Sequence, residues 1–223
     1  FIVNHAGRKT VDYWSLTTAF DISTATFDDG YSISGQEKRA NSIAFNNDGT
    51  RMFIAGVGDI TQVRIHEYSL DIAFDLSSGT THLNSEDLIS FQNHIDGVTF
   101  NYDGTKMYTI NGSEDLMSQF KLTTPYDVST LSLEGTYDLS SLTNNSREVV
   151  FSNDGSKMFI IDDDPDDLIN NKVHEFNLSC NWSVIDGACD DPITTSGGGK
   201  DILSSIESQT ATAKQIAIHA TTP

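Results

Sequence analysis

The densest group of potential metal ligands in this sequence is an acidic run at residues 162–167. It contains five carboxylates, those of Asp162, Asp163, Asp164, Asp166 and Asp167. Carboxylate oxygens are preferred ligands of Ca²⁺. The run does not fit an EF-hand loop, because Asp167 stands where that loop needs glycine and Val173 where it needs glutamate. A calcium site is one interpretation, and a solvated acidic loop is the other.

A second group of polar side chains stands just before three apolar segments of the chain. Its members are Arg39, His94, Asp96, Arg147 and Glu148. Gathered at the mouth of a channel, such guanidinium, imidazole and carboxylate groups could bind a polar ligand. Taken singly, each of them is also typical of a surface or hydrogen-bonded residue.

No catalytic residue follows from the sequence. It has no Gly-x-Ser-x-Gly, no His-Glu-x-x-His and no Walker loop. His66 and His174 share a His-Glu-aromatic pattern, but this repetition indicates a packing position.

The charge excludes one class of partner. The chain has 13 Lys+Arg against 32 Asp+Glu, a formal net charge of -19. Nucleic-acid surfaces need clustered Lys and Arg, so a nucleic-acid partner is not expected. The acidity favours cationic partners such as metal ions. The apolar runs are too short for a transmembrane segment.

The two cysteines allow two interpretations. Cys180 and Cys189 have a spacing that suits a disulfide closing a small loop, and the alternative is two free thiols. A disulfide would indicate maturation in an oxidising compartment.

Two motifs recur along the chain. Residues 45–53, 100–108 and 151–159 share the pattern Phe-x-x-Asp-Gly-[Ser/Thr]-[Lys/Arg]-Met-aromatic. Each Asp-Gly lies between two short apolar runs and predicts a tight turn between strands, with Asp48, Asp103 and Asp154 as turn residues. The second motif, aromatic-x-Leu-x-x-x-aromatic, begins at Trp14, Tyr68, Phe120 and Phe176.

Together the motifs predict four short strands in every 50 to 55 residues, which is typical of a β-propeller blade and unlike the irregular spacing of a β-sandwich. We expect an all-β propeller over residues 1–189, incomplete in this chain: the first repeat lacks its first strand and the last its fourth. Only the loop between the second and third strands varies much in length. It emerges on the same face as the loop between blades, so this face is the expected binding rim.

The C-terminal part differs in composition. We expect a linker at 190–200 and a short helix at 201–223, whose stripe of apolar residues needs a partner. The helix could dock on the propeller, contact a neighbouring copy or lead into a further domain.

The first motif resembles the blades of WD40-like and YVTN-type bacterial β-propellers, over about residues 1–185. The second is similar to repeats of secreted bacterial propellers. The resemblance implies a propeller fold, but these families include lactonases, periplasmic accessory proteins and surface-layer or adhesion proteins. It transfers no catalytic residue.

The leading hypothesis is a non-catalytic binding or structural module of a secreted, cell-surface or periplasmic protein, which mediates assembly or adhesion. Its expected partners are other protein subunits or upstream blades, with self-association through residues 201–220 as one route. The alternative is a calcium-dependent propeller hydrolase of the lactonase type. No cofactor is certain, and Ca²⁺ is the one considered.

Overall fold

The structure is a computed structural model that describes residues 2–4, 9–59, 62–163, 172–185, 193–195 and 200–201. Within these described residues the regular elements are β-strands and two short 3-10 helices. The strands form four antiparallel sheets that follow one another along the chain. We call these sheets blades 1 to 4.

Blades 1 and 2 occupy the N-terminal half of the described chain. Blade 1 consists of β1 (Ile2–Asn4), β2 (Thr10–Leu16) and β3 (Ala25–Ser32), and the 3-10 helix η1 (Ile22–Thr24) precedes β3. Blade 2 consists of β4 (Ala40–Phe45), β5 (Arg51–Asp59), β6 (Gln62–Ile72) and β7 (Asp75–Asp87). In both blades the strands pair in chain order.

Blades 3 and 4 repeat this arrangement. Blade 3 consists of β8 (Gly97–Phe100), β9 (Lys106–Asn111), β10 (Leu116–Leu122) and β11 (Leu131–Asp138), with the 3-10 helix η2 (Val128–Thr130) before β11. Blade 4 consists of β12 (Ser146–Phe151), β13 (Lys157–Asp162), β14 (Lys172–Leu178) and β15 (Ile193–Thr195). A further short strand, β16 (Lys200–Asp201), also pairs with β14.

The end of blade 4 differs from expectation. The sequence predicts three strands in the last repeat and a linker at 190–200, but β15 lies within that segment and gives β14 a hydrogen-bonded neighbour. An unpaired edge of β14 would leave backbone N–H and C=O groups open. Apart from β16, residues 196–223 lie outside the described part of the chain, so the C-terminal helix stays a prediction.

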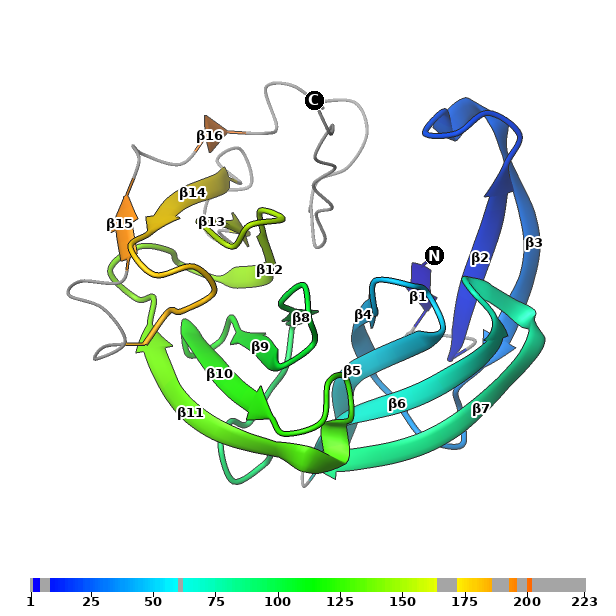
Figure 1. Ribbon diagram of the computed structural model, residues 1–223, viewed down its shortest axis with the longest axis horizontal. Coiled ribbons are helices and arrows are strands. Elements are labelled where there is room, and N and C mark those ends of the chain that lie inside the picture. The colour runs from blue at the N-terminus through cyan, green and yellow to red at the C-terminus, as the bar shows by residue number, and fades with distance from the viewer. Residues whose placement is uncertain are drawn as a thin grey trace.

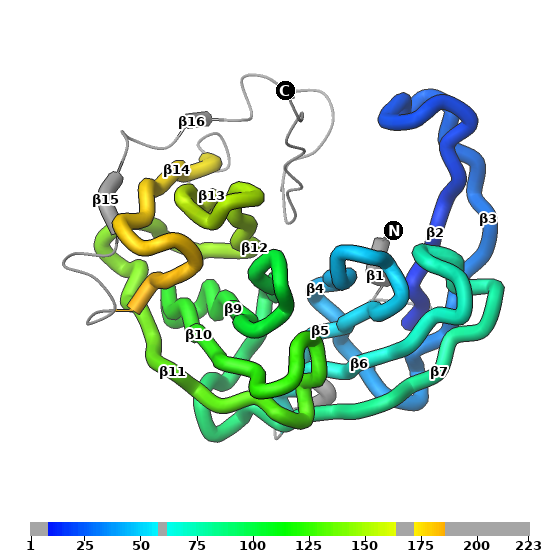
Figure 2. The backbone as a smooth tube through the Cα atoms, in the orientation of Figure 1, coloured from blue at the N-terminus to red at the C-terminus, as the bar shows by residue number. Residues whose placement is uncertain are grey.

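The four blades lie side by side along an arc (Figure 1), and the Cα tube shows the same path (Figure 2). Strands β4, β8 and β12 lie on the inner side of the arc, and β3, β7 and β11 lie on its outer side. Neighbouring inner strands contact each other, β4 with β8 and β8 with β12, and β1 of blade 1 contacts β4. Sheets arranged in this way around an axis are propeller blades. The predicted fold is therefore confirmed, and the described blades do not close a ring.

Each Asp-Gly pair forms the turn between the first and second strands of a blade. In blade 3, Asp103 Oδ1 accepts a hydrogen bond from the Thr105 backbone N–H at 3.0 Å, and Gly104 has a φ of 71°. The equivalent bonds at Asp48 and Asp154 measure 2.9 and 3.0 Å. The prediction that these aspartates are turn residues is confirmed.

The aromatic residue that ends the second motif packs on the turn glycine. Tyr126 donates its backbone N–H to the Gly104 carbonyl at 2.9 Å, and a Cβ on Gly104 would lie 2.3 Å from the tyrosine ring. Phe74 packs on Gly49 in the same way. The two sequence motifs of a repeat therefore meet in one contact, which fixes the third strand against the turn.

The hydrophobic core lies between the blades in three clusters. Between blades 2 and 3, Phe53 and Ile65 of blade 2 pack with Phe120 and Val128 of blade 3. Each blade therefore uses two faces, one toward the preceding blade and one toward the next. In the described part of the chain no helix is long and apolar enough to cross a membrane.

Candidate functional site

The start of each inner strand brings one repeat position to the inner side of the arc. Ser42 pairs with Ala55, Gly97 with Ile110 and Glu148 with Ile161, so these strand starts are equivalent. The residues just before them are Asn41, Asp96 and Arg147. Because the inner strands contact one another, residues more than 50 positions apart come together there.

Asp96 is the centre of this group. Its Oδ1 lies 3.1 Å from Arg147 Nη1 and 3.2 Å from His94 Nε2. Its Oδ2 accepts a hydrogen bond from the Gly112 backbone N–H at 2.9 Å. Burial raises the pKa of Asp96, but His94, Gly112 and Arg147 together outweigh burial and lower the pKa below its ordinary value. Asp96 is therefore an anion that holds two cationic or hydrogen-donating side chains.

Arg147 links Asp96 to blade 4. Its Nε donates to Asp163 Oδ2 at 3.1 Å, so two carboxylates hold one guanidinium in place. The Arg147 side chain is still 24% exposed. Its Nη2 donates no hydrogen bond to a described residue, so this end of the group can donate to a ligand.

His94 extends the group toward blade 2. Its Nε2 lies 3.3 Å from Asn41 Nδ2, which donates to the Ile95 carbonyl at 2.8 Å. The imidazole is 36% exposed, and its Nδ1 has no hydrogen bond within the described residues. We call Asn41, His94, Asp96, Arg147 and Asp163 the inner rim.

Two of the predicted rim residues lie apart from this group. Glu148 is buried, and its Oε2 accepts a hydrogen bond from Ser42 Oγ at 2.9 Å. Arg39 is exposed, and among the described residues its contacts are those of its backbone, whose N–H donates to Glu37 Oε1 at 2.8 Å and whose carbonyl accepts the Val57 N–H at 3.1 Å. The structure thus brings together three of the five predicted ligand-binding residues.

The acidic run lies partly outside the described residues, which include Asp162 and Asp163 but not Asp164, Asp166 or Asp167. Asp162 Oδ1 accepts the backbone N–H groups of Asn144 and Asn145 at 3.1 and 3.0 Å, and Oδ2 lies 3.1 Å from His174 Nε2.

Burial raises the pKa of Asp162, but the His174 contact and the two N–H groups lower it overall. Within the described ranges no three His, Cys, Asp or Glu side chains form a group that could hold a metal ion. Calcium binding by this loop stays a prediction.

A second polar cluster lies buried in blade 2. His66 Nε2 lies 3.5 Å from Glu37 Oε2, and His66 Nδ1 lies 2.7 Å from Ser85 Oγ. Glu37 and His66 are almost fully buried. Burial raises the pKa of Glu37, but His66 and the N–H groups of Arg39 and Lys38 lower it overall. This cluster joins the outer strands to the loop before β4.

Sequence reasoning missed Asn41 and Ser42, although it named Asp96 and Arg147, which match Asn41, and Glu148, which matches Ser42. An alignment of the inner strands would have found them, because they occupy the positions of Asp96 and Gly97. The predicted disulfide stays a prediction, since Cys189 lies outside the described residues.

No family model and no curated protein matches the sequence. A solved structure from Lactobacillus plantarum matches with a TM-score of 0.52 and 11% identity, over 85% of this chain and 48% of its own.

Two further structures score below 0.5. A Bacteroides fragilis protein provisionally named a 6-phosphogluconolactonase has a TM-score of 0.48 and 14% identity, over 80% of this chain and 42% of its own. The nidogen/laminin complex has a TM-score of 0.49 and 14% identity, over 76% of this chain and 55% of its own.

The likeness shows the fold alone. This chain spans about half the length of the structures that it matches.

Proposed function

We propose that this chain is a non-catalytic binding module that mediates protein assembly or adhesion in a secreted, cell-surface or periplasmic protein. The observation that supports the proposal is the inner rim. There Arg147 and His94 are held by carboxylates but keep nitrogen atoms that bind no described residue. Side chains that are fixed before binding lose less entropy when a partner docks.

The remaining nitrogen atoms define the chemistry of the partner. Arg147 Nη2 donates hydrogen bonds and so requires oxygen acceptors. The net charge of -19 repels a strongly anionic ligand. We therefore favour a loop of another protein that presents backbone carbonyl and hydroxyl groups to the rim.

The calcium-dependent hydrolase lacks comparable support. Asp162 and Asp163 already accept hydrogen bonds from His174 and Arg147, and a Ca²⁺ ion would have to compete for both carboxylates. A hydrolase would also need a metal position that is open to substrate.

The test is a screen of loop peptides on an array with the labelled wild-type chain and the Arg147→Gln variant. We expect the wild-type protein to bind a limited set of peptides and the variant to lose this set. Lys121→Gln, a substitution of an exposed lysine on β10, is the matched control and should keep it. Identical patterns for wild type and Arg147→Gln would contradict the proposal.

A further inference from the structure

The imidazole of His94 lies between a hydrogen-bond donor and an acceptor. Its Nε2 is 3.3 Å from Asn41 Nδ2 and 3.2 Å from Asp96 Oδ1. The amide orientation of Asn41 is fixed, because Nδ2 donates to the Ile95 carbonyl at 2.8 Å and a flipped amide would bring two oxygen atoms together. Nε2 of a neutral imidazole either accepts from Asn41 or donates to Asp96, but it cannot do both. The choice decides what His94 offers to a partner.

The charge of Asp96 settles this choice. Its hydrogen bonds and ion pairs lower its pKa, so Asp96 is an anion. A hydrogen bond to an ionised acceptor is about twice as strong as one between neutral groups. The bond from His94 Nε2–H to Asp96 therefore outweighs the bond from Asn41, and neutral His94 carries its proton on Nε2. Its Nδ1 is then a hydrogen-bond acceptor.

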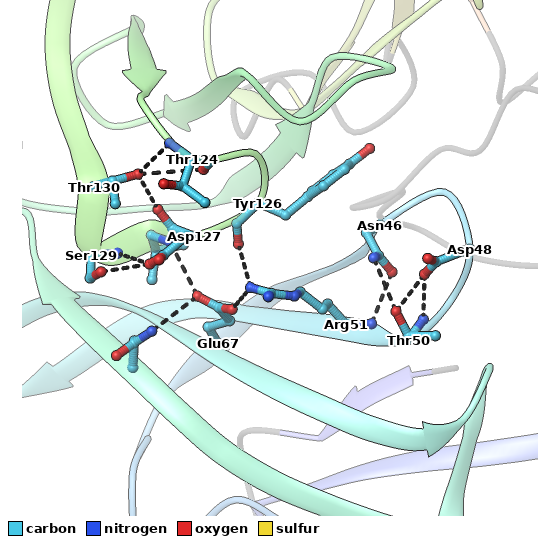
Figure 3. Close-up of polar contacts among 12 residues, drawn as sticks. Asn46, Asp48, Thr50, Arg51, Glu67, Thr124, Tyr126, Asp127, Ser129 and Thr130 are labelled. Carbon is cyan, nitrogen blue, oxygen red and sulfur yellow. Dashed lines mark hydrogen bonds and ion pairs between the residues drawn. The ribbon is translucent and has the colours of Figure 1, made fainter.

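A carboxylate that orients neighbouring groups also lies between blades 2 and 3. Glu67 Oε1 pairs with Arg51, and Glu67 Oε2 accepts the Val128 backbone N–H at 3.1 Å (Figure 3). The Glu67 side chain is fully buried, and its bonds join the two blades. Asp96 differs because the two side chains that it orients, His94 and Arg147, are partly exposed at the inner rim.

Arg147 offers the opposite hydrogen-bonding function. Its Nη1 donates to the same oxygen of Asp96 at 3.1 Å, and its Nε donates to Asp163. A guanidinium has donors only, so Nη2 can donate to a partner. The rim thus presents one acceptor, His94 Nδ1, and one donor, Arg147 Nη2, on two side chains that share Asp96 Oδ1.

A primary carboxamide complements this pair. Its NH₂ group can donate to His94 Nδ1 while its oxygen accepts from Arg147 Nη2, and one carbon carries both groups. A carboxylate has no donor for Nδ1, and the net charge of -19 repels it. The N–H and C=O of one trans peptide group point in opposite directions, so they do not serve two neighbouring atoms. A hydroxyl group would have to serve both nitrogen atoms with one oxygen.

We propose that the inner rim binds the carboxamide of an Asn or Gln side chain on the partner loop, and that Asp96 fixes the His94 tautomer that accepts from it. This inference rests on the proposed function and deepens it by naming the group that the rim recognises. His94 and Arg147 contact the partner. Asp96 is a positioning residue that acts through both of them.

The first test determines the tautomer of His94 in the free chain. Long-range ¹H–¹⁵N NMR at about pH 8, where an ordinary imidazole is neutral, distinguishes a proton on Nε2 from one on Nδ1. His94→Leu assigns the signals. We expect Nε2–H in the wild type and a population shifted toward Nδ1–H in Asp96→Asn, because the neutral amide cannot form the charge-assisted bond. A wild-type His94 that is cationic or protonated on Nδ1, or a tautomer unchanged by Asp96→Asn, would overturn the proposal.

The second test uses loop peptides that the wild-type chain selects on the array. In each peptide, Asn or Gln is replaced by Asp or Glu and, separately, by Ser. We expect both replacements to weaken binding about tenfold or more. His94→Lys exchanges the acceptor for donors, so it should prefer the carboxylate peptide over the carboxamide peptide. Lys121→Gln is the matched control and should keep the wild-type preference. Far-UV circular dichroism establishes that each variant is folded.

The outcomes separate this inference from the proposed function. Selected peptides without Asn or Gln, equal affinities for carboxamide and carboxylate peptides, or an unchanged preference in His94→Lys would overturn the carboxamide site and leave the binding module intact. An array on which the wild-type chain selects no peptide would refute the proposed function and this inference with it.

Discussion

The hydroxyl group of Ser42 on β4 donates a hydrogen bond to Glu148 Oε2 on β12 across 2.9 Å, although 106 residues separate them. Gly97 of β8 makes this approach feasible. A Cβ at Gly97 would lie 2.6 Å from Glu148 Oε1 and 2.8 Å from the Arg147 carbonyl oxygen. The bond therefore ties blades 2 and 4 together past the inner strand of blade 3.

Removal of the Glu148 carboxyl group should destabilise the fold. Glu148→Ala leaves the buried Ser42 hydroxyl without this acceptor, and the expected loss in the free energy of unfolding is about 1–3 kcal/mol. Glu148→Gln keeps an oxygen acceptor and should cost less. Urea denaturation of both variants measures the difference in the free energy of unfolding. Equal stabilities of Glu148→Ala and Glu148→Gln would contradict the role of the hydrogen bond.

The turn glycines should not tolerate a side chain. Gly104→Ala places a Cβ 2.3 Å from the Tyr126 ring at a φ of 71°, a backbone region that disfavours alanine. We expect a loss of about 1–3 kcal/mol in the free energy of unfolding, measured by thermal denaturation. Gly35→Ala is the control, because no heavy atom lies within 4 Å of its Cβ position. A stable Gly104→Ala variant would refute the proposed contact between the motifs.

The inner rim should contribute stability that disappears in acid. The folded state lowers the pKa of Asp96 below its ordinary value of 3.8, because its hydrogen bonds and ion pairs outweigh burial. A carboxyl group whose pKa is lower in the folded protein than in the unfolded protein stabilises the fold at pH values above its pKa in the unfolded state. This stability is lost as the pH falls through its pKa in the folded state.

Asp96→Asn should therefore cost about 1.5–3 kcal/mol at neutral pH and progressively less below pH 3.8. Urea titrations of wild type and variant at several pH values measure this. A difference that does not change with pH would show that the charge of Asp96 is irrelevant.

Glu67 should show the opposite pH dependence. Burial raises its pKa above the ordinary 4.5, although Val128, Arg51 and Asn84 oppose the shift. A carboxyl group whose pKa is higher in the folded protein than in the unfolded protein contributes its full stability at pH values below its pKa in the unfolded state. This contribution is lost as the pH rises through its pKa in the folded state.

Glu67→Gln keeps the acceptor for Val128 but does not titrate. The free energy of unfolding of Glu67→Gln should therefore exceed that of wild type most at neutral pH. This difference should decrease as the pH falls toward 4.5. Denaturation of the two proteins across this range measures the effect. An advantage that grows in acid would contradict the raised pKa.

The blades could be predicted because their signals are local. Asp103-Gly104 and Tyr126 repeat at fixed spacings, and these residues meet in the structure. The rim was predicted only in part, since a ligand group depends on residues that converge from different blades. The burial of Glu148 depends on the missing side chain of Gly97, which no local pattern of blade 4 could reveal.

Binding through the inner rim is the central claim, and the affinity of Arg147→Gln for an array-selected loop peptide tests it most directly. Biolayer interferometry of immobilised peptide should give a dissociation constant about tenfold or more above that of wild type, because the peptide loses its guanidinium donor. Lys121→Gln should bind as wild type does. Equal affinities of Arg147→Gln and wild type would contradict the claim.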